Sequence, residues 1–154
     1  MQFSPDLLQF LTSDCWRVVS SQSNSSLAVV RLREDVPAVA SRRSFPNCLR
    51  VLWAYAEPET DALPDSAEAE EMLTFEEHLS KALEHEHLAV LTAVLTFDGA
   101  RQWVFYTHDV QQCGVRVNAM PQRSERYPIE LDAFGDPEWS YLQEKFLDRF
   151  RPVA

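Results

Sequence analysis

The sequence predicts an α+β fold in which an antiparallel sheet carries helices on one face. From Phe45 onward, apolar residues recur first at the period of a strand and then at the period of a helix, in the order strand, helix, strand, strand, helix, strand. Asp98-Gly99 separates the two adjacent strands and is typical of a tight hairpin turn. The length of 154 residues fits one domain, over residues 1–154.

The N-terminal third predicts a short helix and a hairpin that are additions to this core. Ser4-Pro5 is a helix start, because proline suits the first helical position. Residues 16–20 and 27–33 have strand composition, and the polar stretch SQSNSS between them is typical of a turn.

The core begins with a strand at FPNCLRVLWAYA, in which one face is predicted to hold Phe45, Leu49, Val51, Trp53 and Tyr55. A helix then begins at a predicted capping box, in which Asp65 caps the third helical amide and Glu68 reaches back. Its apolar stripe consists of Met72, Phe75, Leu79, Ala82 and Leu83, and it is expected to end near His87.

The hairpin strands are predicted at residues 88–97 and 101–108. The first is expected to bury one apolar face, made of Ala89, Leu91, Ala93, Leu95 and Phe97. Asp109 then caps a helix that runs to about Met120.

The last strand and the last helix meet within RYPIELDAFGDPEWSYL. Pro128 belongs at the start of a strand or on an edge, so the strand is predicted at residues 127–134. Asp136 is the expected helix cap and Pro137 the first helical residue. The helix carries an aromatic stripe of Trp139, Leu142, Phe146, Leu147 and Phe150.

This order of elements is that of the ferredoxin-like βαββαβ core, extended here by the N-terminal hairpin and the C-terminal helix. The motifs WRVVSSQ, VLWAYA, LPDSAEAEEMLTFEEHL, FDGARQWVFYTHD and RYPIELDAFGDPEW, in this order, resemble the domain of unknown function 695 family. The resemblance covers about residues 16–150 and implies no known activity.

Charge is distributed unevenly along the chain. The net charge is −10, and residues 57–86 hold 11 acidic residues against one base, Lys81. Nucleic-acid binding needs clustered basic residues and is therefore not expected, although VLWAYA and RQWVFY hold aromatics that could stack on bases. The ordinary alternative is that these aromatics form core or are covered by the N-terminal hairpin and the C-terminal helix. No apolar run is long enough to span a membrane, and three scattered cysteines fit a reducing cytoplasm.

Two groups of residues could carry chemistry. His78, His85 and His87 lie among glutamates and could hold a metal, but their spacing lacks the i, i+4 pair of helical zinc sites. Cys113 with His108 and Asp109 could form a thiol nucleophile with its base, but Cys113 falls in the second helical turn. Structural roles account for both groups, and no residue is assigned as catalytic, metal-binding or cofactor-binding.

Three functional hypotheses follow. The favoured one is a non-enzymatic protein-binding or regulatory module that presents its acidic helix or an open sheet edge to a partner, with Glu70, Glu71 and Glu77 on the acidic face. The alternative is a small enzyme using Cys113 and His108 or a metal at the histidines. The third is a homodimer formed through an exposed sheet edge.

Overall fold

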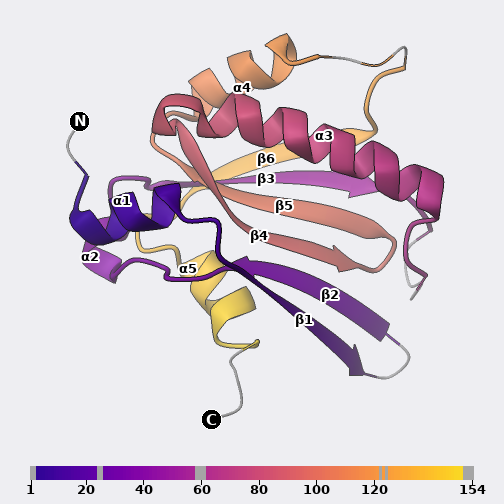
Figure 1. Cartoon of the computed structure of the whole chain (residues 1–154), viewed down its shortest axis with the longest axis horizontal. Coiled ribbons are helices and arrows are strands. Elements are labelled where there is room, and N and C mark those ends of the chain that lie inside the picture. Colours follow the sequence, from indigo (N-terminus) through magenta and orange to yellow (C-terminus); the bar gives the residue numbers. More distant parts are fainter. Residues whose placement is uncertain (1–2, 24–25, 58–61, 122, 124, 151–154) are drawn as a thin grey trace.

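The chain forms one sheet of six strands with helices packed on it, shown as a computed structural model in Figure 1. The structure describes residues 3–23, 26–57, 62–121, 123 and 125–150. The strands are β1 (Trp16–Ser23), β2 (Ser26–Arg33), β3 (Asn47–Ala54), β4 (Ala89–Phe97), β5 (Ala100–Thr107) and β6 (Ile129–Gly135). The helices are α1 (Pro5–Thr12), α2 (Val39–Arg42), α3 (Ser66–Glu84), α4 (Val110–Ala119) and α5 (Ser140–Leu142), with a 3₁₀ turn η1 (His85–His87) and a π-helical turn η2 (Gln143–Leu147). The predicted mixture of helices and an antiparallel sheet is confirmed.

The strand order across the sheet is β1-β2-β4-β5-β3-β6, and every neighbouring pair is antiparallel. The predicted N-terminal hairpin is present as β1 and β2, and β2 pairs with β4. The hairpin therefore continues the central sheet to six strands, with β1 at one edge and β6 at the other.

Both faces of the sheet are covered, each by its own helices (Figure 1). Helices α3 and α4 cover the face on which Trp53, Phe75 and Trp103 are fully buried. Helix α1, α5 and η2 pack on the opposite face around Tyr106 and Trp139. Among the described residues, no helix is both long and apolar enough to cross a bilayer.

Helix α3 begins as predicted but its capping box is not reciprocal. The Asp65 carboxylate accepts a hydrogen bond from the Glu68 amide at 2.9 Å. The Glu68 carboxylate, which was expected to reach back, accepts instead from the indole Nε1 of Trp53 at 2.8 Å. The helix ends at Glu84, before the predicted end at His87, because Glu86 adopts a left-handed backbone with φ of 58°.

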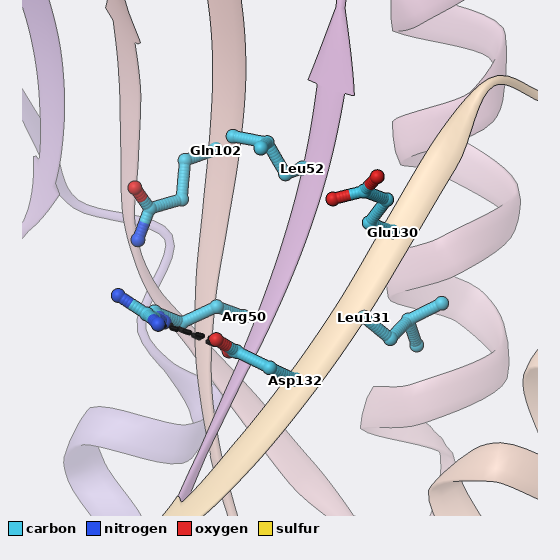
Figure 2. A pocket seen from close by; sticks show the side chains of 6 residues that line it. All are labelled: Arg50, Leu52, Gln102, Glu130, Leu131 and Asp132. Carbon is cyan, nitrogen blue, oxygen red and sulfur yellow. Dashed lines mark hydrogen bonds and ion pairs between the residues drawn. The ribbon is translucent and has the colours of Figure 1, made fainter.

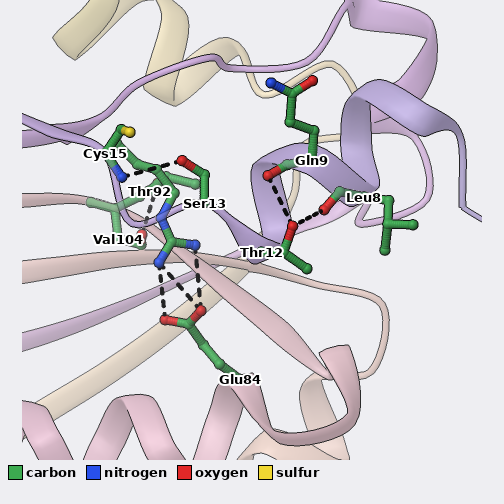
Figure 3. Close-up of polar contacts among 9 residues, drawn as sticks. Leu8, Gln9, Thr12, Ser13, Cys15, Glu84, Thr92 and Val104 are labelled. Carbon is green, nitrogen blue, oxygen red and sulfur yellow. Dashed lines mark hydrogen bonds and ion pairs between the residues drawn. The ribbon is translucent and has the colours of Figure 1, made fainter.

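The predicted apolar face of residues 88–97 is wrong in its second half. A β-bulge between Leu91 and Ala93 shifts the alternation, so Leu91 faces α3 while Ala93 faces the opposite cluster. Thr92, at the bulge, is buried, and its hydroxyl donates to the Val104 carbonyl at 2.8 Å (Figure 3). In β3, similarly, Leu49, Val51 and Trp53 share the predicted face, whereas Phe45 precedes the strand and packs on the other side.

Other local predictions are confirmed. Asp98 and Gly99 both have positive φ (57° and 80°), as the tight turn between β4 and β5 requires. Asp109 caps α4 by accepting from the Gln112 amide at 3.0 Å. The short helix α2 was not predicted.

An ion pair between a buried arginine and a half-buried glutamate joins β2 to α3. Arg33 lies 3.3 Å from the Glu84 carboxylate, and only 7% of its side chain is exposed. Its guanidinium also lies over the rings of Trp16 and Phe10, at 4.9 and 5.6 Å from the ring centres. Burial raises the pKa of Glu84, and the charge of Arg33 opposes that rise. Figure 3 shows the Glu84 carboxylate below the α1 residues Leu8 and Thr12, with dashed lines to the guanidinium that it contacts.

The junction after β6 differs from the predicted helix start. The N-cap residue is Trp139 and not the predicted Asp136, although the Asp136 carboxylate accepts from the amides of Ser140 and Tyr141, at 2.9 and 3.0 Å. The helix therefore begins at Ser140 and not at Pro137. Trp139 adopts a left-handed backbone with φ of 60°, which turns its ring into the core, where it stacks on Tyr106 at 4.5 Å.

Replacing Asp136 by alanine is expected to lower the free energy of unfolding by about 3 kcal/mol, because three donors lose a buried charged acceptor. The donors are the amides of Ser140 and Tyr141 and the hydroxyl of Tyr106, which lies 2.7 Å from Asp136. Denaturant unfolding measures the change. The control is Glu138→Ala, which removes an exposed ion pair with Arg43 and should cost less than about 1 kcal/mol. Equal losses for the two variants would contradict this role of Asp136.

Candidate functional site

Strand β6 is an edge of the sheet and, among the described residues of the six strands, the most exposed one. It pairs with β3 alone, and all of its own residues after Ile129, up to Gly135, are exposed. An edge strand presents unpaired backbone groups along its outer side, which another chain can bind as an additional strand. The other edge is β1, and residues 24–25, which follow it in the sequence, lie outside the described residues.

The ladder geometry shows which β6 amides point outward. The Asp136 amide donates to the Pro46 carbonyl at 2.7 Å, in register with the β3–β6 ladder. Because inward and outward amides alternate in an antiparallel ladder, the amides of Glu130 and Asp132 face β3. The amides of Leu131 and Ala133 therefore face away from the sheet.

An ion pair between Arg50 and Asp132, at the centre of β6, holds this strand against β3. Arg50 of β3 donates through Nε to Asp132 Oδ1 at 2.8 Å and through a second nitrogen to Asp132 Oδ2. This bond lowers the pKa of Asp132 and raises the pKa of Arg50. The guanidinium lies over the rings of Tyr141 and Phe134, at 5.1 and 5.2 Å from their centres.

A small hollow, called the sheet hollow, lies beside β6 on the face of the sheet that carries the Arg50–Asp132 ion pair. Its volume is about 180 Å³. Figure 2 shows its lining residues, which are Arg50, Leu52, Gln102, Glu130, Leu131 and Asp132. Within the described part of the chain, the Arg50 guanidinium neutralises Asp132, whereas the exposed Glu130 carboxylate forms no ion pair. The sheet hollow is therefore negative.

A larger hollow, called the helix hollow, lies on the opposite side of β6. It has a volume of about 460 Å³ and lies between β6, α4 and the segment before β6. The lining residues are Phe75, Val117, Asn118, Met120, Arg123, Arg126, Tyr127, Ile129 and Leu131. Arg123 donates to Glu71 at 2.8 Å and its guanidinium lies over Tyr127 at 4.9 Å. The hollow therefore combines a floor of apolar side chains with a polar rim that includes Asn118, Arg123 and Arg126.

The three candidate metal ligands are not brought together. His78 and His85 line a groove of about 510 Å³ between α3 and α4, where Arg116 donates to the His85 carbonyl at 2.7 Å. His87 instead meets the ring of Phe3 edge-on, with the ring centres 5.8 Å apart. Among the described residues, no three His, Cys, Asp or Glu side chains are placed to hold a metal ion.

Cys113 and His108 are also separated. The Cys113 thiol is fully buried on the α3 side of the sheet and lies 3.3 Å from the Thr107 hydroxyl. His108 packs on Phe45, which belongs to the cluster on the opposite face. Burial raises the pKa of Cys113, which is the opposite of what a thiolate nucleophile requires.

The strand aromatics are core residues, as the ordinary alternative predicted, but α3 covers them. Trp53, Trp103 and Phe105 are fully buried and have no surface on which a base could stack. The Phe75 ring of α3 packs against both tryptophans, whereas Tyr106 of RQWVFY, on the other face, stacks on Trp139 of the C-terminal segment.

The acidic helix is partly used for internal contacts. Glu76 pairs with Arg31 and accepts from the Trp103 indole, and Glu71 pairs with Arg123. Glu70 and Glu77 are exposed and form no ion pair within the described residues.

The sequence alone did not single out Arg50, Leu52, Gln102 or Glu130. One signal was present: Pro128 followed by alternating charged and apolar residues in IELD is typical of an edge strand, because Pro and charges discourage self-pairing. The hollows themselves depend on residues distant in sequence, so no local pattern predicts them.

Thiol labelling in the native state is expected to modify Cys15 and spare the other two cysteines. Cys15 is exposed, whereas Cys48 and Cys113 are buried, and burial raises the pKa of Cys48 to about 12. At pH 8 the native protein should therefore take up one equivalent of a maleimide reagent, and the denatured protein three. Rapid native modification of Cys113, located by mass spectrometry with Cys15→Ser as the control, would revive the thiol-enzyme alternative.

Comparisons with known proteins bear on the family. Searches of the curated proteins and of the solved structures returned no match. A family model described as a family of unknown function, DUF695, matches residues 14–147, which include all six strands. The chain therefore belongs to the DUF695 family.

Proposed function

We propose that this protein is a non-enzymatic binding module that takes up an extended segment of a partner protein along the outer edge of β6. The observation that carries the proposal is an exposed edge strand with a hollow on each of its two sides. In binding by strand addition, backbone hydrogen bonds supply affinity and pockets for alternate side chains supply specificity. The outward amides of Leu131 and Ala133 and the two hollows match these two requirements.

The positions of the candidate catalytic residues support binding over catalysis. The Cys113 thiol lies on the Thr107 hydroxyl, and His108, its proposed base, packs on Phe45 on the other side of the sheet. The histidines of the metal hypothesis diverge, with His87 on Phe3. A small enzyme remains the alternative function, and it would need a rearrangement of these groups.

We further propose that β3, α3, β4, β5, α4 and β6 constitute a ferredoxin-like unit that places β6 at its edge. The order β4-β5-β3-β6 supports this, because each helical connection passes over the strand that lies between the two it joins. The three free thiols support a reducing cytoplasm as the place of action.

The exposed acids of α3 are proposed to attract a basic partner from a distance. Glu70 and Glu77 are the residues expected to act, since Glu71 is already paired with Arg123. Reversal of both to lysine should slow association at low salt and leave the rate at high salt unchanged, because salt screens exposed charges. If the association rate at low salt is unaffected by the reversal, the acidic helix plays no part in attracting the partner.

Ala133→Pro is expected to abolish partner binding, because proline removes an outward amide and leaves the ladder with β3 intact. Ala133→Val is the matched control, since it keeps the amide and suits a strand. Affinity capture from cell extract, quantified by mass spectrometry, should give a stoichiometric partner with the parent and the valine variant only. Thermal unfolding checks that both variants are folded. Capture of the same partner by the proline variant would contradict binding along β6.

A further inference from the structure

We infer that the segment bound by β6 alternates basic and apolar side chains, with the basic ones over the sheet hollow and the apolar ones over the helix hollow. This inference rests on the proposed function and adds the chemistry of the partner. Side chains of an added strand point alternately to the two faces of the sheet. Residues opposite Glu130 therefore lie on the side of the sheet hollow, and residues opposite Leu131 on the side of the helix hollow.

The charge of the sheet hollow selects a basic side chain. The Asp132 carboxylate is neutralised by Arg50, so Glu130 supplies the uncompensated charge. Cross-strand neighbours lie about 5 Å apart, which places a lysine or arginine of the added strand within reach of Glu130. An acidic side chain in the same position would face Glu130 directly and be repelled.

The helix hollow imposes the opposite preference. Its floor holds the buried apolar side chains of Phe75, Val117 and Met120, and the exposed Leu131 and half-buried Ile129 beside them offer apolar surface to an aliphatic side chain. Arg123 and Arg126 stand at its rim, and Arg126 is exposed. Arg123 is paired with Glu71, so the charge of Arg126, which forms no ion pair within the described residues, is the one that disfavours a basic side chain on this side. The two sides of β6 therefore reinforce one alternating pattern.

The same charges disfavour a second copy of the chain as the occupant. In an antiparallel pairing of two β6 strands that overlap fully, Asp132 lies opposite Asp132 of the second copy. A shift that places Leu131 on the two-fold axis sets Glu130 opposite Asp132. Like charges directly opposite one another destabilise a strand pair. Arg50 offsets the charge of each Asp132, so this repulsion is weaker than that between two free carboxylates, and the dimerisation measurement below tests the second copy directly.

The test uses two blocked peptides of about nine residues, one alternating lysine with valine and one alternating glutamate with valine, a length that covers an average strand. Titration calorimetry or fluorescence anisotropy should show that the parent protein prefers the lysine peptide. Glu130→Lys should weaken the lysine peptide about threefold to fivefold, as expected for an exposed ion pair, and strengthen the glutamate peptide. The control for net charge is Asp14→Lys, since Asp14 is exposed and precedes the opposite edge strand.

The outcomes separate this inference from the proposed function. If both peptides bind equally well and Ala133→Pro abolishes both, strand addition stands and the inferred polarity is overturned. If neither peptide binds, or if Ala133→Pro has no effect on binding, the proposed function itself fails. Concentration-dependent dimerisation of the parent that Ala133→Pro abolishes, measured by analytical ultracentrifugation, would overturn the inference in favour of a second copy.

Discussion

Asp136 is the residue on whose hydrogen bonds the position of β6 and of the segment after it depends. The backbone amide of Asp136 donates to the Pro46 carbonyl at the end of β6, and its carboxylate accepts from Tyr106, Ser140 and Tyr141. One buried acceptor thus joins the last strand, the middle of the sheet and the start of α5. Because Trp139 follows in a left-handed conformation, its ring enters the core beside Tyr106, and the chain continues under the sheet. With its end fixed in this way, β6 keeps its place at the edge of the sheet even though most of its residues are exposed.

The carboxylates of α3 explain how a strongly acidic helix packs on a sheet rich in tryptophan. Glu68 and Glu76 accept from the indole nitrogens of Trp53 and Trp103, so buried indoles keep a hydrogen-bond partner. Glu84 pairs with the buried Arg33. Removing one partner of such a pair is costly, because the other charge stays buried without compensation. The acidity of this segment is therefore in part structural, and the portion left for a partner is small.

The elements that could be predicted from the sequence are those specified by neighbouring residues. Asp109 and the Asp98-Gly99 turn act within a few positions of the chain, and both are where their patterns indicated. The bulge after Leu91 and the left-handed Trp139 could not be predicted, because packing against distant strands and helices selects them. The candidate site follows the same division. Its exposed strand had a local signal in Pro128 and the alternating charges, whereas its two hollows are assembled from five separate segments of the chain. The histidine and cysteine groups, which were prominent in the sequence, are dispersed by the fold.

The most direct test of β6 as a binding edge is residue-resolved amide hydrogen exchange by NMR, on the free protein and with the lysine–valine peptide. The amides of Glu130 and Asp132 face β3 and should be protected in both states. The amides of Leu131 and Ala133 face outward, so they should exchange freely alone and become protected when the peptide adds as a strand. Protection that appears elsewhere, with Leu131 and Ala133 still exchanging freely, would contradict the account.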